Sequence, residues 1–364
     1  MKIINIETFI MRVPIRRPIG DATHDFEHWS APGCWITTDE GLVGTGYTGL
    51  EGHGESLITD VIDHHYAPQL LGKNPHDVVQ HWEALQWGKM HWIGRAGVTQ
   101  MALSAVDIAL WDLKAKAAGL PLWRLLGGHK ESVPSYNTDG GWLNWSTEEL
   151  VADTARLIDE GWGGVKIKLG KTDLREDLSR LSAVREHIGS GPMLMVDVNM
   201  AWDVPRARAA SAGLAENEVY WLEEPLYPDD VAGHAELAGS ISTPIALGES
   251  LYHRYQFRDF LTAQAIGFVQ ADVTRVGGVT EWTRIAALAS AFSTPVVPHA
   301  GDMMQVHQHL VGATANAPML EYIPWLLELF VDPVRVNDGT VHLPEVPGAS
   351  TTMREDAIER WRVR

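Results

Sequence analysis

Ionisable side chains recur at the ends of short apolar runs in the second half of the sequence. The run Gly164–Gly170 carries two lysines, Lys166 and Lys168, that would share one face of a strand while apolar residues share the other. A parallel strand covered on both sides is normally apolar on both faces, because a buried ammonium group needs anions beside it. The pair therefore predicts acidic partners at the same place in the fold.

Three carboxylates are spaced to meet those lysines. Asp197, Glu223 and Glu249 follow one another at intervals of 26 residues, about the length of a strand with its crossover helix. Brought together at neighbouring strand ends, they would repel one another strongly without a cation. Carboxylate oxygens suit Mg²⁺, which keeps coordination positions open for water and substrate. We therefore expect these three residues to bind Mg²⁺.

Further ionisable groups would supply acid and base chemistry. Lys166 and the metal are expected to depress the pKa of Lys168, which would make Lys168 a base near neutral pH. His299 and Asp272 would form a second pair on the opposite side, with the carboxylate orienting the ring. Lys166, which stays charged in this interpretation, would leave the site ready to accept a carboxylate.

Each of these residues alone has an ordinary structural explanation. A Lys-x-Lys pair is common on exposed edge strands, and a carboxylate such as Asp197 or Glu249 often caps a helix. His299 could be a hydrogen-bonded loop histidine, and Asp272 could pair with Arg275. Their occurrence in order at successive strand ends is what favours an active site.

The elements that must position these side chains form a repeat. From residue 133 onward, short β-rich runs alternate with stretches long enough for a helix, a pattern typical of βα units around a parallel sheet. Eight units predict an α/β fold with a (β/α)8-type barrel, modified in its last unit, whose chemistry lies at the C-terminal strand ends. The predicted strands are Val133–Asp139, Val165–Leu169, Met193–Asn199, Val219–Glu224, Pro244–Glu249, Gly267–Val273, Pro295–His299 and Met319–Ile323.

Two segments flank the barrel, which we place at residues 126–323. Residues 1–125 are predicted to form an α+β capping domain, and residues 324–364 are expected to return to it. Residues 18–30 are polar and rich in turn formers, so they are interpreted as a loop and a candidate lid. The elements expected in the capping domain are strands at Ile3–Val13, Cys34–Gly41 and Gly41–Thr48 and a helix at Gly97–Ala118.

The composition of the chain limits the classes of molecule that it is expected to bind. The 364 residues carry a formal net charge of −18, which argues against nucleic acid as a partner. No run of about 18 apolar residues could span a membrane, and the first residues lack the apolar region of a signal peptide. The single cysteine, Cys34, excludes an internal disulfide and fits a reducing compartment. We expect a cytoplasmic enzyme that acts on a small anionic substrate.

Several segments carry a family resemblance: Ala105–Lys114, Leu125–Gly128, Lys166–Lys168, Asp197–Asn199, Trp221–Pro225, Gly248–Glu249 and Pro298–His299. Together they resemble the enolase superfamily, and more closely its mandelate racemase subgroup, over nearly the whole chain. The muconate-cycloisomerase-like subgroup places a lysine on the sixth strand, whereas this chain has none after Lys171. The resemblance therefore favours the mandelate racemase subgroup.

The resemblance implies one Mg²⁺ ion per subunit, removal of the proton α to a carboxylate to form an enediolate, and a homo-oligomer, either a dimer or an octamer. The roles it implies are metal ligation by Asp197, Glu223 and Glu249; proton transfer by Lys168 on one face and by His299 with Asp272 on the other; neutralisation of the substrate carboxylate by Lys166; a hydrogen bond to the enediolate from Glu321; and contact with a substrate hydroxyl from Asn199.

These expectations lead to two reactions and one non-catalytic alternative. The first reaction is dehydration of a sugar acid, an aldonate or aldarate, to a 2-keto-3-deoxy acid. It is favoured because His24 and Tyr136, the expected substrate contacts, lie in polar segments that suit a polyol. The second is racemisation or epimerisation of a 2-hydroxy acid by the same two bases. The third is a catalytically silent relative, which would be expected to have lost a ligand or a base.

Overall fold

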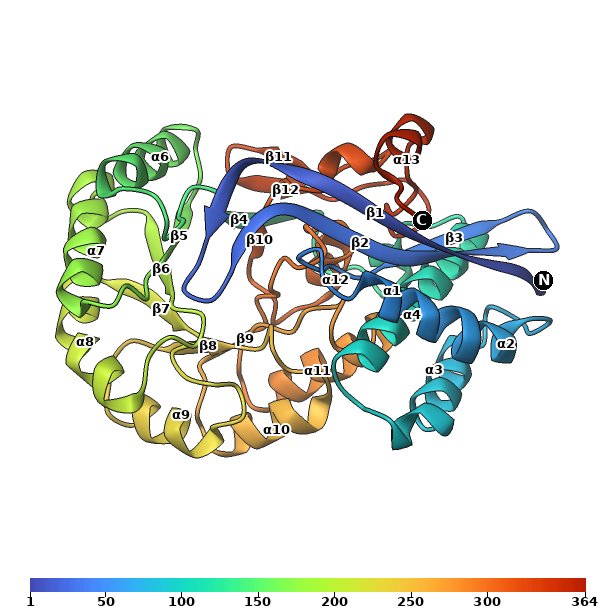
Figure 1. Ribbon diagram of the computed structural model, residues 1–364, viewed down its shortest axis with the longest axis horizontal. Helices are drawn as coiled ribbons and strands as arrows, with labels where there is room; N and C mark the ends of the chain where they lie inside the picture. The colour runs from blue at the N-terminus through green and yellow to red at the C-terminus, as the bar shows by residue number, and fades with distance from the viewer.

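The chain begins with a three-stranded antiparallel sheet and a group of helices. Its elements are β1 (Ile3–Gly20), β2 (Asp25–Thr38), β3 (Val43–Tyr47), α1 (Glu55–Val61), η1 (Ile62–Tyr66), α2 (Ala67–Leu70), α3 (Val78–Gln86), η2 (Lys89–Trp92), α4 (Val98–Ala118) and α5 (Leu122–Leu125). The computed structural model describes residues 1–364, and Figure 1 shows this part in blue and cyan beside the rest of the molecule. The sheet order is β1-β2-β3, and α4 confirms the long helix expected at Gly97–Ala118.

The strands β1 and β2 form one long hairpin, which shows that the interpretation of residues 18–30 as a loop was wrong. Pairing continues up to Gly20, so only residues 21–24 form the turn. The polar composition concealed the strand ends because buried apolar residues are few within residues 18–30. Among them are Phe26, which packs against Trp142, and Trp29, which packs against Trp325.

The remainder of the chain alternates strands and helices. Seven of the eight predicted parallel strands are present, whereas Pro295–His299 makes only one parallel bridge, between Val296 and Val269. The elements are β4 (Ser132–Asn137), α6 (Thr147–Asp159), β5 (Gly164–Lys168), α7 (Leu174–Ile188), β6 (Met193–Asp197), α8 (Val204–Glu216), β7 (Val219–Glu223), α9 (Val231–Ala238), β8 (Ile245–Leu247), α10 (Arg254–Thr262), β9 (Phe268–Val269), α11 (Val279–Ala291), α12 (His307–Ala313), β10 (Leu320–Tyr322), η3 (Leu327–Leu329), β11 (Arg335–Asn337), β12 (Thr340–His342) and α13 (Glu355–Trp361).

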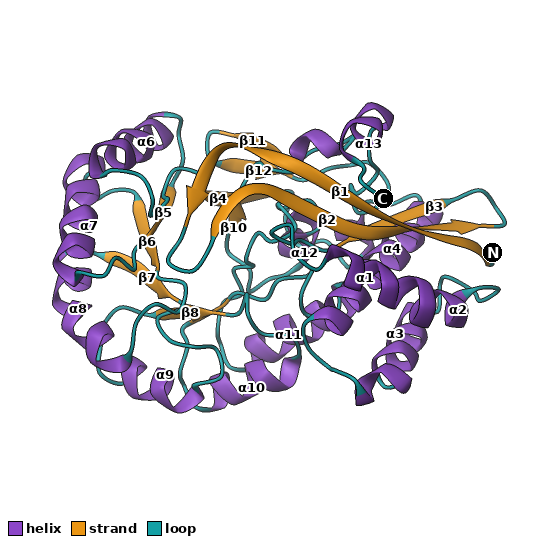
Figure 2. Ribbon diagram, viewed as in Figure 1, coloured by secondary structure: helices purple, strands orange, loops and turns teal.

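The parallel strands form the (β/α)8-type arrangement that the repeat predicted. The sheet runs β11-β12-β4-β5-β6-β7-β8-β9, and β10 pairs with β4. Helices α6 to α11 lie in an arc outside the strands, as Figure 2 shows with helices in purple and strands in orange. No helix of the structure combines the length and apolar character needed to cross a membrane.

Side-chain alternation on β5 separates the core from the interior of the barrel. Val165 and Ile167 belong to the large apolar cluster that also contains residues of α6 and α7. Lys166 and Lys168 are buried on the other face of the same strand. The strand is therefore covered on both faces, and its inner face is charged.

Helix α4 anchors the loop that follows β9. Ser104 Oγ accepts a hydrogen bond of 2.8 Å from the backbone N–H of Gly277, and Asp107 Oδ2 accepts one of 2.9 Å from the N–H of Thr280. Gln100 Nε2 donates to the carbonyl of Val276 at 2.9 Å. These buried contacts connect the N-terminal part of the chain to the loop beyond Asp272.

The end of the chain lies beside its beginning. Backbone N–H of Val363 donates to the carbonyl of Ile10 at 2.9 Å, and Arg362 forms an ion pair of 2.7 Å with Glu7. Earlier in the same segment, β12 pairs with β4 of the barrel. The domain limits placed after residues 125 and 323 stay predictions.

The close approach of α4 to β3 yields a stability prediction. A Cβ at Gly46 would collide with the backbone of Ala105 and Ala109, so Gly46→Ala must displace the helix. We expect this variant to lose about 3 kcal/mol in free energy of unfolding and to melt several degrees lower by circular dichroism. The matched control is Gly191→Ala, because a Cβ there meets no atom within 4 Å. An unchanged melting temperature for Gly46→Ala would contradict the packing described here.

Candidate functional site

The inner face of β5 places both lysines among carboxylates. Lys166 Nζ lies 2.6 Å from Glu223 Oε1 and 2.7 Å from Glu321 Oε1. Lys168 Nζ lies 2.5 Å from Asp197 Oδ2. The strand register explains this arrangement, because Lys168 is paired with Asp197, which in turn is paired with Glu223 on the next strand. The structure therefore supplies the acidic partners that two buried ammonium groups require.

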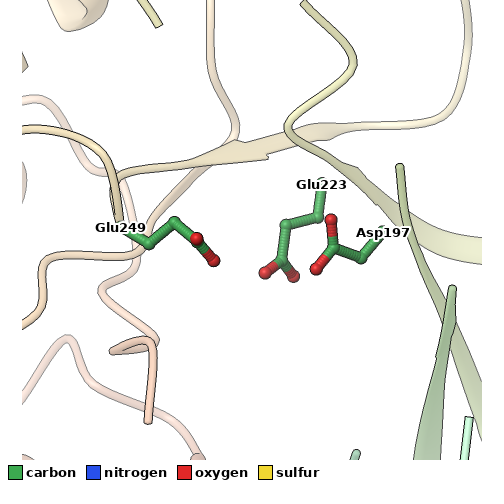
Figure 3. Close-up of side chains that lie close together, drawn as sticks. All are labelled: Asp197, Glu223 and Glu249. Atoms are coloured by element: carbon green, nitrogen blue, oxygen red, sulfur yellow. The ribbon is translucent and has the colours of Figure 1, made fainter. Parts of the chain in front are cut away.

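The side chains of Asp197, Glu223 and Glu249 converge on one space (Figure 3). One oxygen atom from each lies within 4.8 Å of the others. Trp221 Nε1 donates a hydrogen bond of 3.0 Å to Glu223 Oε2, which fixes that carboxylate. Because Mg²⁺ binds oxygen ligands at about 2.1 Å, modest side-chain movements would bring all three into its coordination shell. The chemistry and convergence of this ligand set fit such an ion.

The pKa of Lys168 differs from the sequence expectation. Burial lowers the pKa of its ammonium group, but the Asp197 carboxylate opposes burial and the net shift is upward. The depressed pKa expected from the sequence assumed a bound metal ion, so it stays a prediction; without the ion, the lysine forms an ion pair. Asp197 is also a candidate metal ligand, and a cation bound to it would act on the pKa of Lys168 in the opposite direction.

His299 and Asp272 form the predicted pair. His299 Nδ1 lies 2.8 Å from Asp272 Oδ2, and Thr274 donates to the other carboxylate oxygen from both its N–H and its hydroxyl. Burial lowers the pKa of His299, but Glu249 and Asp272 outweigh it and raise that pKa. His299 Nε2, the nitrogen not used by the dyad, lies 3.3 Å from Glu249 Oε2. The ring therefore has one nitrogen fixed and the other directed towards the carboxylate triad.

A second histidine, His307, holds the backbone next to this dyad. The backbone N–H of Val273 donates to His307 Nε2 at 2.9 Å, and His307 Nδ1 lies 2.5 Å from Asp302 Oδ1. His307 and His309 are both fully buried. His307 thus holds the backbone directly after Asp272.

Glu321 is surrounded by donors. Thr138 Oγ1 and the Ala300 N–H donate to its two oxygens at 2.6 and 2.9 Å. Burial raises the pKa of Glu321, but Lys166 and His299 outweigh burial and lower it to about 2. Glu321 is therefore a carboxylate here, and the hydrogen-bond donor role implied by the resemblance requires a proton to reach it during the reaction.

A cavity of about 200 Å³ lies over these groups. Lys166, Lys168, His299 and Glu321 line it together with two predicted substrate contacts, Asn199 and His24. The side-chain oxygen of Asn199 is buried without a hydrogen-bond partner, so it is available to a substrate hydroxyl. His24 reaches the cavity from the turn between β1 and β2.

Tyr136 was predicted to contact the substrate, but it does not line the cavity. Its ring packs in the barrel interior against Trp221, with ring centroids 5.3 Å apart, and it is not among the lining residues. Strand alternation explains the error, because Thr138 lies on the same face two residues nearer the strand end. Thr138 occupies the cavity wall in its place.

One wall of the cavity is aromatic, contrary to the expectation of polar walls. Phe26, Trp29, Trp142 and Trp325 all line it, and the rings of Trp29 and Trp325 lie 5.2 Å apart. These residues come from three distant segments, so no local pattern marked them. The sequence argument from polar lid segments to polar walls therefore holds for only part of the cavity.

Three charged lining residues were also not assigned to the site. Asp21 and Glu51 come from the capping side, and Arg275 comes from the loop after β9. The guanidinium of Arg275 lies 3.8 Å from both Glu249 and Asp272. Of these three residues, only Arg275 was noted in the sequence, as a possible ion-pair partner of Asp272.

Both parts of the chain match known protein families. Residues 149–357 match the family described as enolase C-terminal domain-like, and residues 5–127 match the mandelate racemase / muconate lactonizing enzyme N-terminal domain. The chain belongs to the enolase superfamily, in its mandelate racemase subgroup. The resemblance inferred from the motifs is confirmed.

Relatives within this subgroup match nearly the whole chain. An L-talarate/galactarate dehydratase of Salmonella typhimurium is 36% identical over 334 residues, covering 90% of this chain and 81% of the relative. A 3,6-anhydro-alpha-L-galactonate cycloisomerase of Streptomyces coelicolor is 34% identical over 366 residues, covering 98% and 99%. The crystal structure of an L-talarate dehydratase from Polaromonas, complexed with Mg and L-glucarate, superposes with a TM-score of 0.93 at 34% identity, covering 100% of this chain and 98% of that one.

The carboxylate triad yields a prediction for metal binding. Glu249→Gln removes one anionic ligand, so the affinity for Mg²⁺ measured by isothermal titration calorimetry should fall by about 10-fold or more. Glu51→Gln is the matched control, because it removes a carboxylate that lines the same cavity outside the triad. Its Mg²⁺ affinity should change by less than about 3-fold. Equal affinities of Glu249→Gln and the wild type would show that the ligand set is wrong.

Proposed function

We propose that this protein is a Mg²⁺-dependent hydro-lyase that dehydrates a sugar acid, an aldonate or aldarate, to a 2-keto-3-deoxy acid. The observation that carries the proposal is the placement of two proton-transfer groups, Lys168 and His299, around one carboxylate triad at the wall of a cavity. Relatives named talarate/galactarate, galactonate and arabinonate dehydratases support the substrate class.

The binding step rests on Lys166. Its ammonium group is fully buried and is the charge that would pair with the substrate carboxylate. A Mg²⁺ ion held by Asp197, Glu223 and Glu249 would supply further positive charge against the enediolate. Asn199 and His24 would contact hydroxyl groups of the bound sugar acid. Glu321 would hydrogen-bond the enediolate once it has acquired a proton.

Proton transfer is divided between the two sides of the cavity. Lys168, once deprotonated, removes the proton α to the carboxylate, and the electron pair of that C–H bond forms the enediolate. The enediolate electrons then form the C2–C3 double bond as the β-hydroxyl leaves with a proton from His299. The resulting enol tautomerises to the 2-keto-3-deoxy acid. Asp272 orients His299 throughout and stabilises its charged form.

Racemisation or epimerisation of a 2-hydroxy acid is the second candidate. Inversion at one carbon requires two separate proton-transfer groups. Lys168, at the end of β5, and His299, which follows the segment bridged to β9, are two such groups. Such a reaction would return a proton to C2 without loss of the β-hydroxyl. The two candidates differ in product and not in residues.

We also propose that the enzyme works in the cytoplasm as a homo-oligomer, without nucleic acid or membrane as partner. The buried free thiol of Cys34 suits a reducing compartment. The net charge of −18 disfavours polyanionic partners.

Incubation in D2O tests the proposed reaction. With Mg²⁺ and a library of aldonic and aldaric acids, we expect a keto acid that carries deuterium at C3 and lacks the original C2 hydrogen, detected by NMR. His299→Asn should slow its formation by about 100-fold or more, because the leaving hydroxyl loses its acid. An epimer with deuterium at C2 and no keto acid would establish the second candidate instead. Failure to convert any sugar acid would contradict the dehydratase proposal.

A further inference from the structure

Acidic side chains gather on the capping side of the cavity. His24 lies between two of them, with Nδ1 3.3 Å from Asp21 Oδ2 and Nε2 3.7 Å from Glu51 Oε2. The Asp21 side chain is only 4% exposed, and its Oδ1 accepts hydrogen bonds of 2.7 Å from the backbone N–H groups of Thr23 and His24. The position of this carboxylate is therefore fixed by the turn of the hairpin.

The cations of the cavity are already paired. Lys166 contacts Glu223 and Glu321, and Lys168 contacts Asp197. A metal ion that bound Asp197 and Glu223 would compensate those two carboxylates and leave Lys166 available to one substrate carboxylate.

The remaining cation, Arg275, is engaged elsewhere. It lies 3.8 Å from Glu249 and Asp272 and donates to the backbone carbonyl of Glu249 at 3.0 Å. The aromatic wall described above adds area for C–H groups but no positive charge. The Nε of Arg275 has no hydrogen-bond partner; burial raises the pKa of Glu51, and the charge of Arg275 lowers it. The one guanidinium near Glu51 is therefore already shared with two other carboxylates, Glu249 and Asp272.

We propose that Asp21 and Glu51 are specificity residues that select sugar monocarboxylates, the aldonates, and disfavour aldarates. This inference rests on the proposed function, because it assumes that one end of a sugar acid is held at Lys166. The second carboxylate of an aldarate would then lie in a cavity whose capping side carries two carboxylates and one shared imidazole. The terminal hydroxyl of an aldonate would instead donate hydrogen bonds to the same oxygens.

Matched acid pairs test the selection without relying on turnover. D-gluconate with D-glucarate, and D-galactonate with galactarate, differ only in the terminal group. Three tryptophans line the cavity, so binding of each acid in the presence of Mg²⁺ is measured by tryptophan fluorescence. We expect the Kd of at least one aldonate to be about 10-fold lower than that of its matched aldarate.

Variants assign that preference to the two residues. In the double variant Asp21→Asn/Glu51→Gln, the preference for aldonate should shrink by about 5-fold, because the aldarate binds more tightly. Asn and Gln keep the acceptor oxygens that hold the turn. Glu27→Gln is the matched control, because it removes a charge from the exposed side of the same hairpin, and it should leave the preference unchanged.

Each result has a definite meaning. Aldarates that bind wild type as tightly as their matched aldonates, or an unchanged preference in the double variant, would overturn the assignment. Selective binding of aldonates without keto-acid formation would contradict the dehydratase proposal alone. Binding of none of the four acids would overturn the selection and its assumption together.

Discussion

The site depends on two ammonium groups that are buried inside a barrel. Lys166 and Lys168 lie almost fully buried on the inner face of β5, so the fold must place carboxylates within hydrogen-bonding distance. Two of those carboxylates, Asp197 and Glu223, also belong to the converging triad. The same carboxylates thus stabilise the lysines and would ligate a cation. The charge of Lys168, the affinity for the metal ion and the charge of the substrate pocket therefore depend on one another.

The surrounding structure covers much of this charge cluster. The hairpin of β1 and β2 extends from the N-terminal sheet to the cavity and contributes both aromatic and charged residues to its wall. Helix α4 fixes the loop after β9 from the other side. Exclusion of water strengthens the electrostatic interactions among the buried groups. The capping part of the chain is therefore as necessary to the proposed chemistry as the barrel.

Regular features were predictable from the sequence, and features formed by distant segments were not. The period of the βα units and the alternation on β5 located the barrel strands, the lysines and the triad, because each follows from local geometry. The hairpin over residues 18–30 was missed because polar residues outnumber its buried ones. The aromatic wall and the positions of Asp21 and Glu51 arise from tertiary contacts alone. The spacing also predicted acidic partners for the lysines, but not that the Asp197 carboxylate would outweigh burial and raise the pKa of Lys168.

The most direct test measures Mg²⁺ affinity in Lys166→Met by calorimetry, with circular dichroism to verify the fold. If lysine and metal share the same carboxylates, removal of an ammonium group 2.6 Å from Glu223 and 3.6 Å from Asp197 should tighten Mg²⁺ binding. The account predicts an increase of about 10-fold in affinity, because electrostatic repulsion between the two cations is removed. Weaker or unchanged Mg²⁺ binding in a folded variant would contradict it.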